Sequence, residues 1–303
     1  MIQVEHNTER RAGLTMVELL VSVVVLLVVM LSFGMIMRQI QRVVSTGEKS
    51  IRTNSAAAAI VGAIRSDIGR ATRNGMMCIT QTGAKSPPLL TFTAAGVVPS
   101  KTDAGSAVDR ASANASLVAM SLCDNTSTAS PSPDLDVLYS QRWLLTDVTH
   151  GDRIDLDLAN IQRLPRSGMN AGVLPRLSGI ALPCSTSTPD EADNLWPVLA
   201  DRCEWVSVTW TDGQLDANGL LRWYGVDYDA GQYVVKWRNT PPDPTNVEFD
   251  VSGVGANVYR ALWTHHDQNN WPRALRIRYR LIEDANATPI EGRVYEVICP
   301  VGG

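Results

Sequence analysis

The chain has 303 residues, a formal net charge of -4 and 45% hydrophobic residues, which fits one or two globular domains rather than a disordered or fibrous chain. Its charge is uneven: residues 38–73 hold seven basic and two acidic residues, whereas residues 74–303 carry a net charge of -8. An acidic distal part argues against nucleic acid as a partner, because phosphate binding needs clustered Lys and Arg. Anionic lipid and DNA are the alternative partners of the basic stretch, but its charges are expected to be spread around a helix and to form a plain solvated face.

One segment is long and apolar enough to cross a membrane. Leu19 to Met37 are 19 residues without a charge, and no later stretch is comparable. A polar leader, Met1 to Gly13, precedes this segment and ends in Arg10-Arg11-Ala12-Gly13. No cleavage site of the A-x-A type follows Met37, so the apolar helix is predicted to stay attached to the mature protein.

The sequence around Gly13 carries the strongest functional signal. Arg10-Arg11-Ala12-Gly13 is followed by Leu14-Thr15-Met16-Val17-Glu18 and then by the apolar run. This stretch resembles the class III leader of type IV pilins and type II secretion pseudopilins. The resemblance implies that a prepilin peptidase cleaves between Gly13 and Leu14 and methylates the new amine of Leu14, although Phe is more usual in the family at the Leu14 position. It also makes Glu18 the fifth residue of the mature chain.

Glu18 needs a partner on physical grounds. A carboxylate at the edge of a hydrocarbon span is costly unless it is paired, and a favourable place in the first helical turn offsets little of that cost. We expect Glu18 to pair with the free amine of Leu14. The partner amine is that of the same chain, four residues away and about 6 Å along the axis, or that of a neighbouring subunit. The resemblance favours the neighbouring subunit, as the contact that registers an incoming chain.

The apolar segment is predicted to continue as an amphipathic stalk helix. There is no proline between Leu14 and Ser86, and apolar residues recur at helical spacing from Ile40 to Ile68. We therefore predict a membrane or filament-core helix over residues 14–37 and a stalk helix over residues 38–73, with Gly47 as a weak point. The run from Ala63 to Cys78 is similar to the end of the stalk in PilW-type minor pilins.

The remainder of the chain is predicted to form a loop-rich insertion, residues 74–136, and a β-rich head, residues 137–303. The predicted strands are 152–158, 205–210, 220–226, 232–238, 274–282 and 293–298, with hairpin chemistry at Asp212-Gly213, Asn218-Gly219 and Asp229-Ala230-Gly231. Trp271 to Ile277 resembles a strand entry in pseudopilin J and PilW relatives. The expected fold class is α+β, pilin-like: a long N-terminal helix with a predominantly antiparallel β head packed on its distal half.

Five cysteines follow the apolar helix, so two disulfides and one leftover thiol are expected if that part is exported. Cys184 and Cys203 are the favoured pair, because they would close a short Pro-rich loop. The sequence contains no Cys-x-x-Cys motif, so it does not indicate a zinc site. The adjacent His265 and His266 are expected to be a surface pair and not metal ligands. The pairs Asp155/Asp157 and Asp227/Asp229 are weak candidates for calcium, since neither has a third clustered carboxylate. No cofactor, metal or enzymatic activity is expected.

The resemblance implies a minor pilin-like subunit of a type IV pilus, acting in filament assembly. A J-like pseudopilin of type II secretion is the alternative, and a membrane-anchored extracytoplasmic enzyme or binding protein is the rival class. The implied location is the bacterial inner membrane, with one span, a cytoplasmic N-terminus and an extracytoplasmic head, and later the filament. Implied partners are the prepilin peptidase, other pilins or pseudopilins, the inner-membrane assembly platform and membrane lipid.

Overall fold

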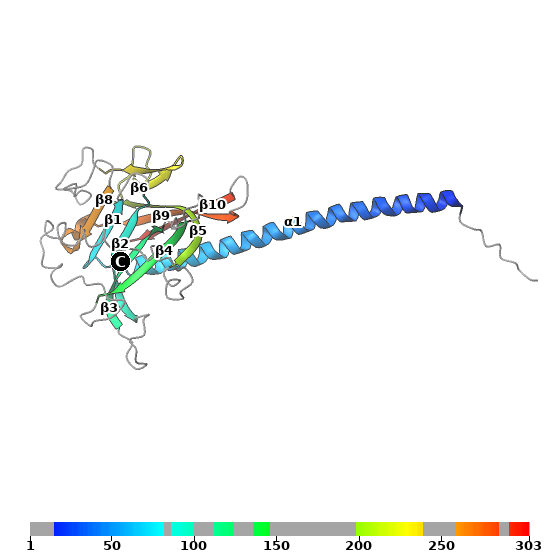
Figure 1. Cartoon of the computed structure of the whole chain (residues 1–303). Coiled ribbons are helices and arrows are strands. Elements are labelled where there is room, and N and C mark those ends of the chain that lie inside the picture. The colour runs from blue at the N-terminus through cyan, green and yellow to red at the C-terminus, as the bar shows by residue number, and fades with distance from the viewer. Residues whose placement is uncertain are drawn as a thin grey trace, which may run out of the picture. The chain divides into compact units, whose positions relative to one another are not determined.

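A computed structural model of the chain describes residues 15–81, 86–99, 112–123, 136–145, 198–238, 259–284 and 291–302. The chain divides into two compact units, Met1–Arg52 and Thr53–Gly303. One helix, α1 (Met16–Gly69), begins in the first unit and ends in the second (Figure 1). The helix starts two residues after the predicted Leu14 and ends four residues before the predicted Arg73.

In the first unit, α1 presents its apolar side chains to the outside. The large apolar residues from Met16 to Met37 are between 44% and 90% exposed. The helix is long and apolar enough to cross a membrane, with a mean hydropathy of 3.0 over its most apolar window. Gly47 does not interrupt the helix, because α1 is continuous from Met16 to Gly69.

The second unit contains a ten-stranded sheet in which every described strand pair is antiparallel. The strands are β1 (Met76–Gln81), β2 (Leu89–Pro99), β3 (Ser112–Cys123), β4 (Asp136–Leu144), β5 (Val198–Thr211), β6 (Tyr224–Asp229), β7 (Gln232–Lys236), β8 (Tyr259–Thr264), β9 (Ala274–Asp284) and β10 (Glu291–Pro300), and a 3₁₀ turn, η3, covers His265–Asn270. Their order is β10-β9-β5-β4-β3-β2-β1-β8, and β6 and β7 extend from β5. This arrangement confirms the α+β class.

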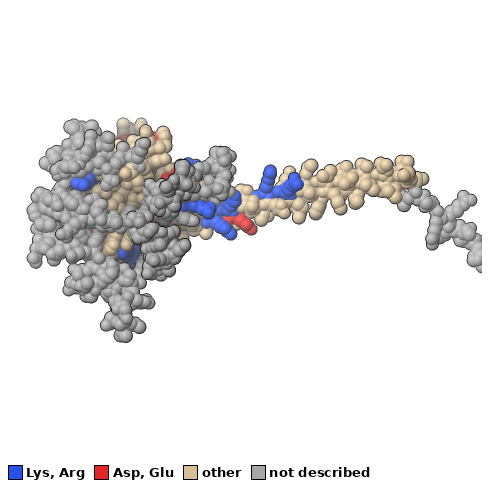
Figure 2. Space-filling view, in the orientation of Figure 1, with Lys and Arg blue, Asp and Glu red and all other residues tan. Residues whose placement is uncertain are grey.

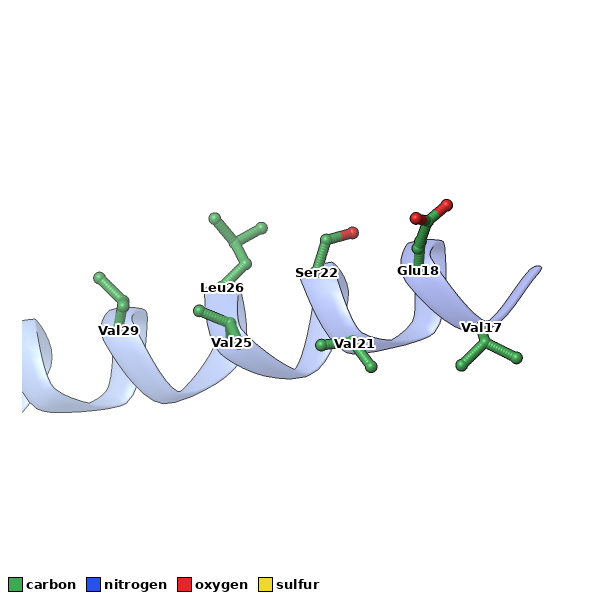
Figure 3. A pocket seen from close by; sticks show the side chains of 7 residues that line it. All are labelled: Val17, Glu18, Val21, Ser22, Val25, Leu26 and Val29. Atoms are coloured by element: carbon green, nitrogen blue, oxygen red, sulfur yellow. The ribbon is translucent and has the colours of Figure 1, made fainter. Parts of the chain in front are cut away.

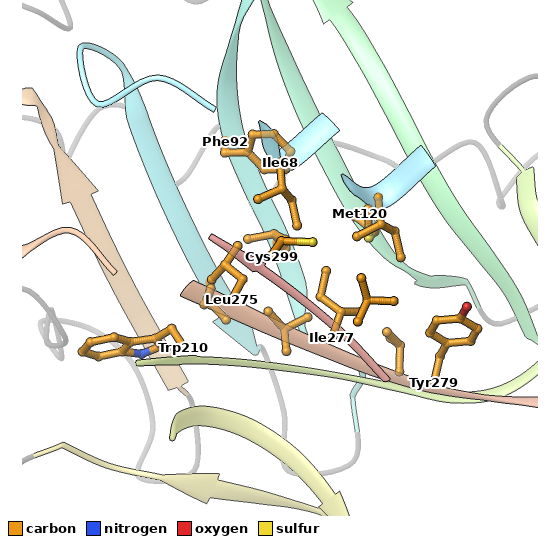
Figure 4. Packing of buried hydrophobic residues seen from close by; sticks show 14 of the residues in the cluster. Ile68, Phe92, Met120, Trp210, Leu275, Ile277, Tyr279 and Cys299 are labelled. Atoms are coloured by element: carbon orange, nitrogen blue, oxygen red, sulfur yellow. The ribbon is translucent and has the colours of Figure 1, made fainter. Parts of the chain in front are cut away.

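The last turns of α1 supply one side of the core of the second unit. Ala57, Ile60, Ile64 and Ile68 recur every three or four residues and are at most 3% exposed. They form one cluster with the residues of each strand that point to the same face. Figure 4 shows Ile68 among core residues from several strands, which include Phe92, Met120, Leu275, Ile277, Tyr279 and Cys299.

The prediction of a loop-rich insertion over residues 74–136 is wrong for the described residues. Three strands, β1, β2 and β3, lie in this range, and all three belong to the sheet. The Ser, Thr and Ala residues of β2 and β3 suggested loops, but strands with small side chains are stable when both faces of the sheet are buried. Thr91 and Ala119 are examples, each at most 1% exposed.

The later strands agree better with the sequence. The predicted segments 205–210, 232–238, 274–282 and 293–298 coincide with β5, β7, β9 and β10, whereas the segment predicted at 220–226 begins as a strand only at Tyr224. Ala230 and Gly231 join β6 to β7 with positive φ angles of 49° and 83°, the conformation of a tight hairpin turn. The predicted strand at 152–158 lies outside the described residues.

Candidate functional site

Glu18 lies in the first turn of α1 and closes a reciprocal cap with Thr15. The backbone N–H of Thr15 donates to Oε2 of Glu18 at 2.9 Å, and the Thr15 hydroxyl donates to the same oxygen at 3.0 Å. In return, the Glu18 N–H donates to Thr15 Oγ1 at 3.3 Å. This is the capping box that a Thr-x-x-Glu sequence specifies, and it satisfies donors that the helix itself leaves unpaired.

Thr15 is a partner of Glu18 in addition to the Leu14 amine expected above, and the Thr-x-x-Glu spacing is a sufficient sequence signal for it. Both hydrogen bonds that the Glu18 carboxylate accepts from Thr15 use Oε2. Gly13 and Leu14 lie outside the described residues, so cleavage between them, methylation of Leu14 and pairing of Glu18 with the Leu14 amine stay predictions.

Glu18 belongs to one face of α1. Figure 3 shows Glu18, Ser22 and Leu26 pointing to the same side of the helix. A shallow groove on α1 is lined by Val17, Glu18, Val21, Ser22, Val25, Leu26 and Val29. The lining is mostly apolar, with four valines and Leu26 beside Ser22 and Glu18.

The face that carries Glu18 continues beyond the membrane-length segment. Eleven residues are close to three full turns, so residues at that spacing remain on one side of a continuous helix. Glu18, Val29, Ile40 and Ile51 have this spacing, and Val43 and Val44 lie beside Ile40. From Ile40 to Ile51 these four apolar side chains are between 51% and 72% exposed.

The described basic residues of the first unit, which are four of the seven basic residues in 38–73, gather on the opposite side of α1. At about 100° per residue, Arg38, Arg42, Lys49 and Arg52 fall within an arc of roughly 80°. All four are exposed. We call this set the basic arc. Figure 2 shows Lys and Arg only from the middle of the helix onward, whereas the part nearer its start is almost entirely without charge.

In the second unit, the main buried charge cluster surrounds Asp227 on β6. Asp227 is 2% exposed and accepts from Lys236 Nζ at 2.6 Å and from Arg278 Nη1 at 2.9 Å, with Arg276 Nη2 at 3.5 Å. Burial alone would raise the pKa of Asp227, but the hydrogen bond and charge of Lys236 and the charge of Arg278 hold it below the ordinary value.

The ion pairs of Asp227 argue against calcium binding at this residue. Three basic side chains occupy its carboxylate, and Asp229 is exposed two residues later. Within the described residues, no group of three or more His, Cys, Asp or Glu side chains is placed to hold a metal ion. Asp155 and Asp157 lie outside those residues. The rings of His265 and His266 lie 3.8 Å apart on the 3₁₀ turn η3.

The cysteines correct a second expectation. Cys78, Cys203 and Cys299 are buried cysteines outside any disulfide, which leaves two of the five cysteines and room for at most one disulfide within the chain, not two. Burial raises the pKa of Cys78 to about 12, despite the opposing charge of Arg260, so its thiol is inert near neutral pH. The Cys203 sulfur lies 3.4 Å from the Trp205 carbonyl oxygen. Cys184 lies outside the described residues, but Cys203 is outside any disulfide, so the predicted pair Cys184–Cys203 is not formed.

Comparisons with protein-family models, with curated proteins and with solved structures found no match to this chain.

Proposed function

We propose that this chain is a structural subunit of a pilin-like filament, held in a membrane by α1 and then assembled through the same helix. The leader motif ending at Gly13 favours a minor pilin of a type IV pilus, acting in assembly. Under this proposal a prepilin peptidase cleaves before Leu14, and the head emerges on the extracytoplasmic side of the bacterial inner membrane. The partners are other pilins or pseudopilins and the assembly platform.

The observation that carries the proposal is the length of the apolar face of α1. The uncharged segment Leu19–Met37 is about 28 Å long, which already matches a hydrocarbon core of about 30 Å. A simple anchor needs no apolar face beyond Met37. Here the face continues through Ile40, Val43, Val44 and Ile51, all exposed, for a further 20 Å or so. Neighbouring helices would cover this surface in a filament.

Glu18 supports the same interpretation, because it lies on that face. Its Oε2 is held by Thr15, and the carboxylate is thereby oriented at the start of the helix. A neighbouring subunit's Leu14 amine is the cation that would neutralise it when helices pack side by side. Extraction from lipid into such a bundle exchanges lipid contacts for helix contacts at little hydrophobic cost.

The decisive experiment changes the apolar face outside the span. The double variant Ile40→Gln/Ile51→Gln keeps the membrane segment and the head intact, so we expect normal membrane insertion but loss from sheared filaments. Ser45→Gln/Thr46→Gln is the matched control, because both residues lie on or beside the basic arc. Normal incorporation of the Ile40/Ile51 variant would refute a polymerising role and favour the membrane-anchored enzyme or binding protein.

The N-terminus provides a separate test. Mass spectrometry of the protein from cells with an active prepilin peptidase should find a chain that begins with a methylated Leu14. A chain that retains its first thirteen residues would contradict the proposal. The type II pseudopilin alternative gives the same N-terminus, and co-purification with pilus subunits or with secretion pseudopilins separates the two.

A further inference from the structure

The basic arc of α1 lies on the side of the helix that the proposed assembly face leaves unused. Arg38 and Arg42 are one turn apart, and Lys49 and Arg52 follow on the same side. All four side chains are exposed, and Glu48 is the only acidic residue between Arg38 and Arg52. The arc therefore presents a concentrated positive charge.

The position of Arg38 along the helix indicates what this charge meets. Arg38 is the first charged residue after Glu18, and it directly follows the uncharged segment. That segment spans the hydrocarbon core, so Arg38 emerges where the core ends. The headgroup layer extends about 5 to 8 Å further on each side, and Arg42 is about 6 Å beyond Arg38 along the axis.

We propose that Arg38 and Arg42 bind the phosphates of anionic phospholipids, and that this contact sets the depth of α1 in the bilayer before assembly. Side chains on a helix lean toward its N-terminus, so both guanidinium groups are directed back toward the membrane surface. Each can bind a phosphate through two parallel N–H···O contacts. The inference rests on the membrane stage of the proposed function.

The contact restrains the helix in one direction only. Movement toward the N-terminal side would bring Arg38 and Arg42 into hydrocarbon, which is costly for a charged side chain. For Arg38 and Arg42 themselves, movement toward the head only exchanges phosphates for water. The two arginines therefore prevent the helix from sinking, while extraction into a filament remains open to it.

Lys49 and Arg52 provide an internal control for this inference. They carry the same charge on the same side, but they lie about 16 and 21 Å beyond Arg38 along the helix. That distance exceeds both the headgroup layer and the Debye length of about 8 Å at physiological salt. A phosphate contact therefore requires the first pair and not the second, whereas an acidic protein surface bound along the arc would require both pairs.

The test uses the full-length chain in phosphatidylcholine vesicles with trace spin-labelled phosphatidylglycerol or spin-labelled phosphatidylcholine. Electron spin resonance measures the motionally restricted lipid at the protein surface and hence the relative association of the two lipids. At low salt we expect phosphatidylglycerol to be preferred by about threefold or more, falling toward equality in 0.5 M NaCl. Arg38→Gln/Arg42→Gln should abolish the preference, and Lys49→Gln/Arg52→Gln should keep most of it.

Each other outcome has a defined meaning. Equal association of the two lipids with the unmodified chain, when restricted lipid is present, overturns this inference and leaves the proposed function standing. Equal loss in both double variants also overturns it, in favour of an acidic partner surface along the whole arc. If neither lipid gives a restricted component, α1 is not in the bilayer, and the membrane stage of the proposed function fails with it.

Discussion

Thr15 and Glu18 determine how the helix that carries the proposed function begins. The two side chains exchange three hydrogen bonds of 2.9 to 3.3 Å at the first turn of α1. The carboxylate is consequently restrained within the single chain. A restrained group loses less conformational freedom when it binds a partner.

Replacing Thr15 by Val tests this restraint, because Val retains the shape of Thr without its hydroxyl. We expect the start of α1 to lose about 1 kcal/mol of stability, seen as faster backbone amide hydrogen exchange over residues 16–19 in detergent micelles. Thr15→Ser keeps the hydroxyl and should exchange like the unmodified chain. Unchanged exchange in Thr15→Val would show that the cap does not stabilise this turn.

Asp227 makes a pH-dependent contribution to the head. Its pKa lies below the ordinary value of 3.8, so the folded state binds protons less readily than the unfolded state. Its contribution is complete above about pH 4 and is lost as the pH falls through the lowered folded pKa. Asp227→Asn should therefore lower the free energy of unfolding by about 2 kcal/mol at pH 6, and by less as the pH approaches 3.

Urea unfolding of the full chain in detergent, followed by tryptophan fluorescence at each pH, measures the effect of this change. Asp229→Asn is the matched control, because Asp229 lies on the same hairpin and is exposed. A difference between unmodified and Asp227→Asn chains that stays constant from pH 6 to pH 3 would contradict the assignment.

At the scale of elements, one ion pair joins the buried end of α1 to the sheet. Asp67 is 7% exposed, and its carboxylate is paired with Arg142 on β4 and accepts from the Ser140 hydroxyl at 3.3 Å. The Tyr279 hydroxyl on β9 donates to the Ala57 carbonyl at 3.3 Å. Polar contacts to β4 and β9 thus fix the helix, in addition to its apolar face.

Asp67→Ala is expected to destabilise the head by about 2 to 3 kcal/mol, because it leaves Arg142 without its carboxylate partner in a part-buried place. The double variant Asp67→Ala/Arg142→Ala should recover part of this loss, with a coupling of about 1 kcal/mol or more in chemical unfolding. Ser66→Ala is the control at the neighbouring exposed position. Strictly additive effects would show that the pair contributes nothing as a pair.

At the scale of the whole molecule, the boundary between the two units lies inside a continuous helix. The second unit begins at Thr53, and the first buried helix residue is Ala57. The last turns of α1 are therefore part of the core of the head, whereas residues before Thr53 are not. Along the chain, α1 is therefore exposed in its first part and buried on one face in its last turns.

Two truncations test this division. A fragment of residues 53–303 should fold and unfold cooperatively without detergent, because it retains the whole core. A fragment of residues 70–303 should not, because it lacks Ile60, Ile64 and Ile68, each at most 1% exposed in the core. Circular dichroism and thermal unfolding distinguish the two, and a folded 70–303 fragment would refute the role assigned to the end of α1.

The sequence by itself determined the helix and the character of its first half. The uninterrupted apolar residues Leu19–Met37, without proline, specify a helix, and Glu18 is the carboxylate directly before them. Both signals depend only on neighbours along the chain. The Thr15–Glu18 cap was equally local. The strands with hairpin turns, β6 and β7, and the C-terminal pair β9 and β10 were found for the same reason.

Only the tertiary structure decided the rest. The Ser, Thr and Ala residues of β2 and β3 suggest loops until burial on both faces of the sheet makes them strands. Asp227 meets Arg276 and Arg278 across 49 and 51 residues, and Asp67 meets Arg142 across 75 residues, so no spacing along the chain reveals these contacts. The basic arc depends partly on sequence and partly on structure. The spacing of its residues is local, but they share one side of the helix only because α1 is continuous through Gly47. Local signals specify elements, but long-range pairing determines which side chains share a face or an interior.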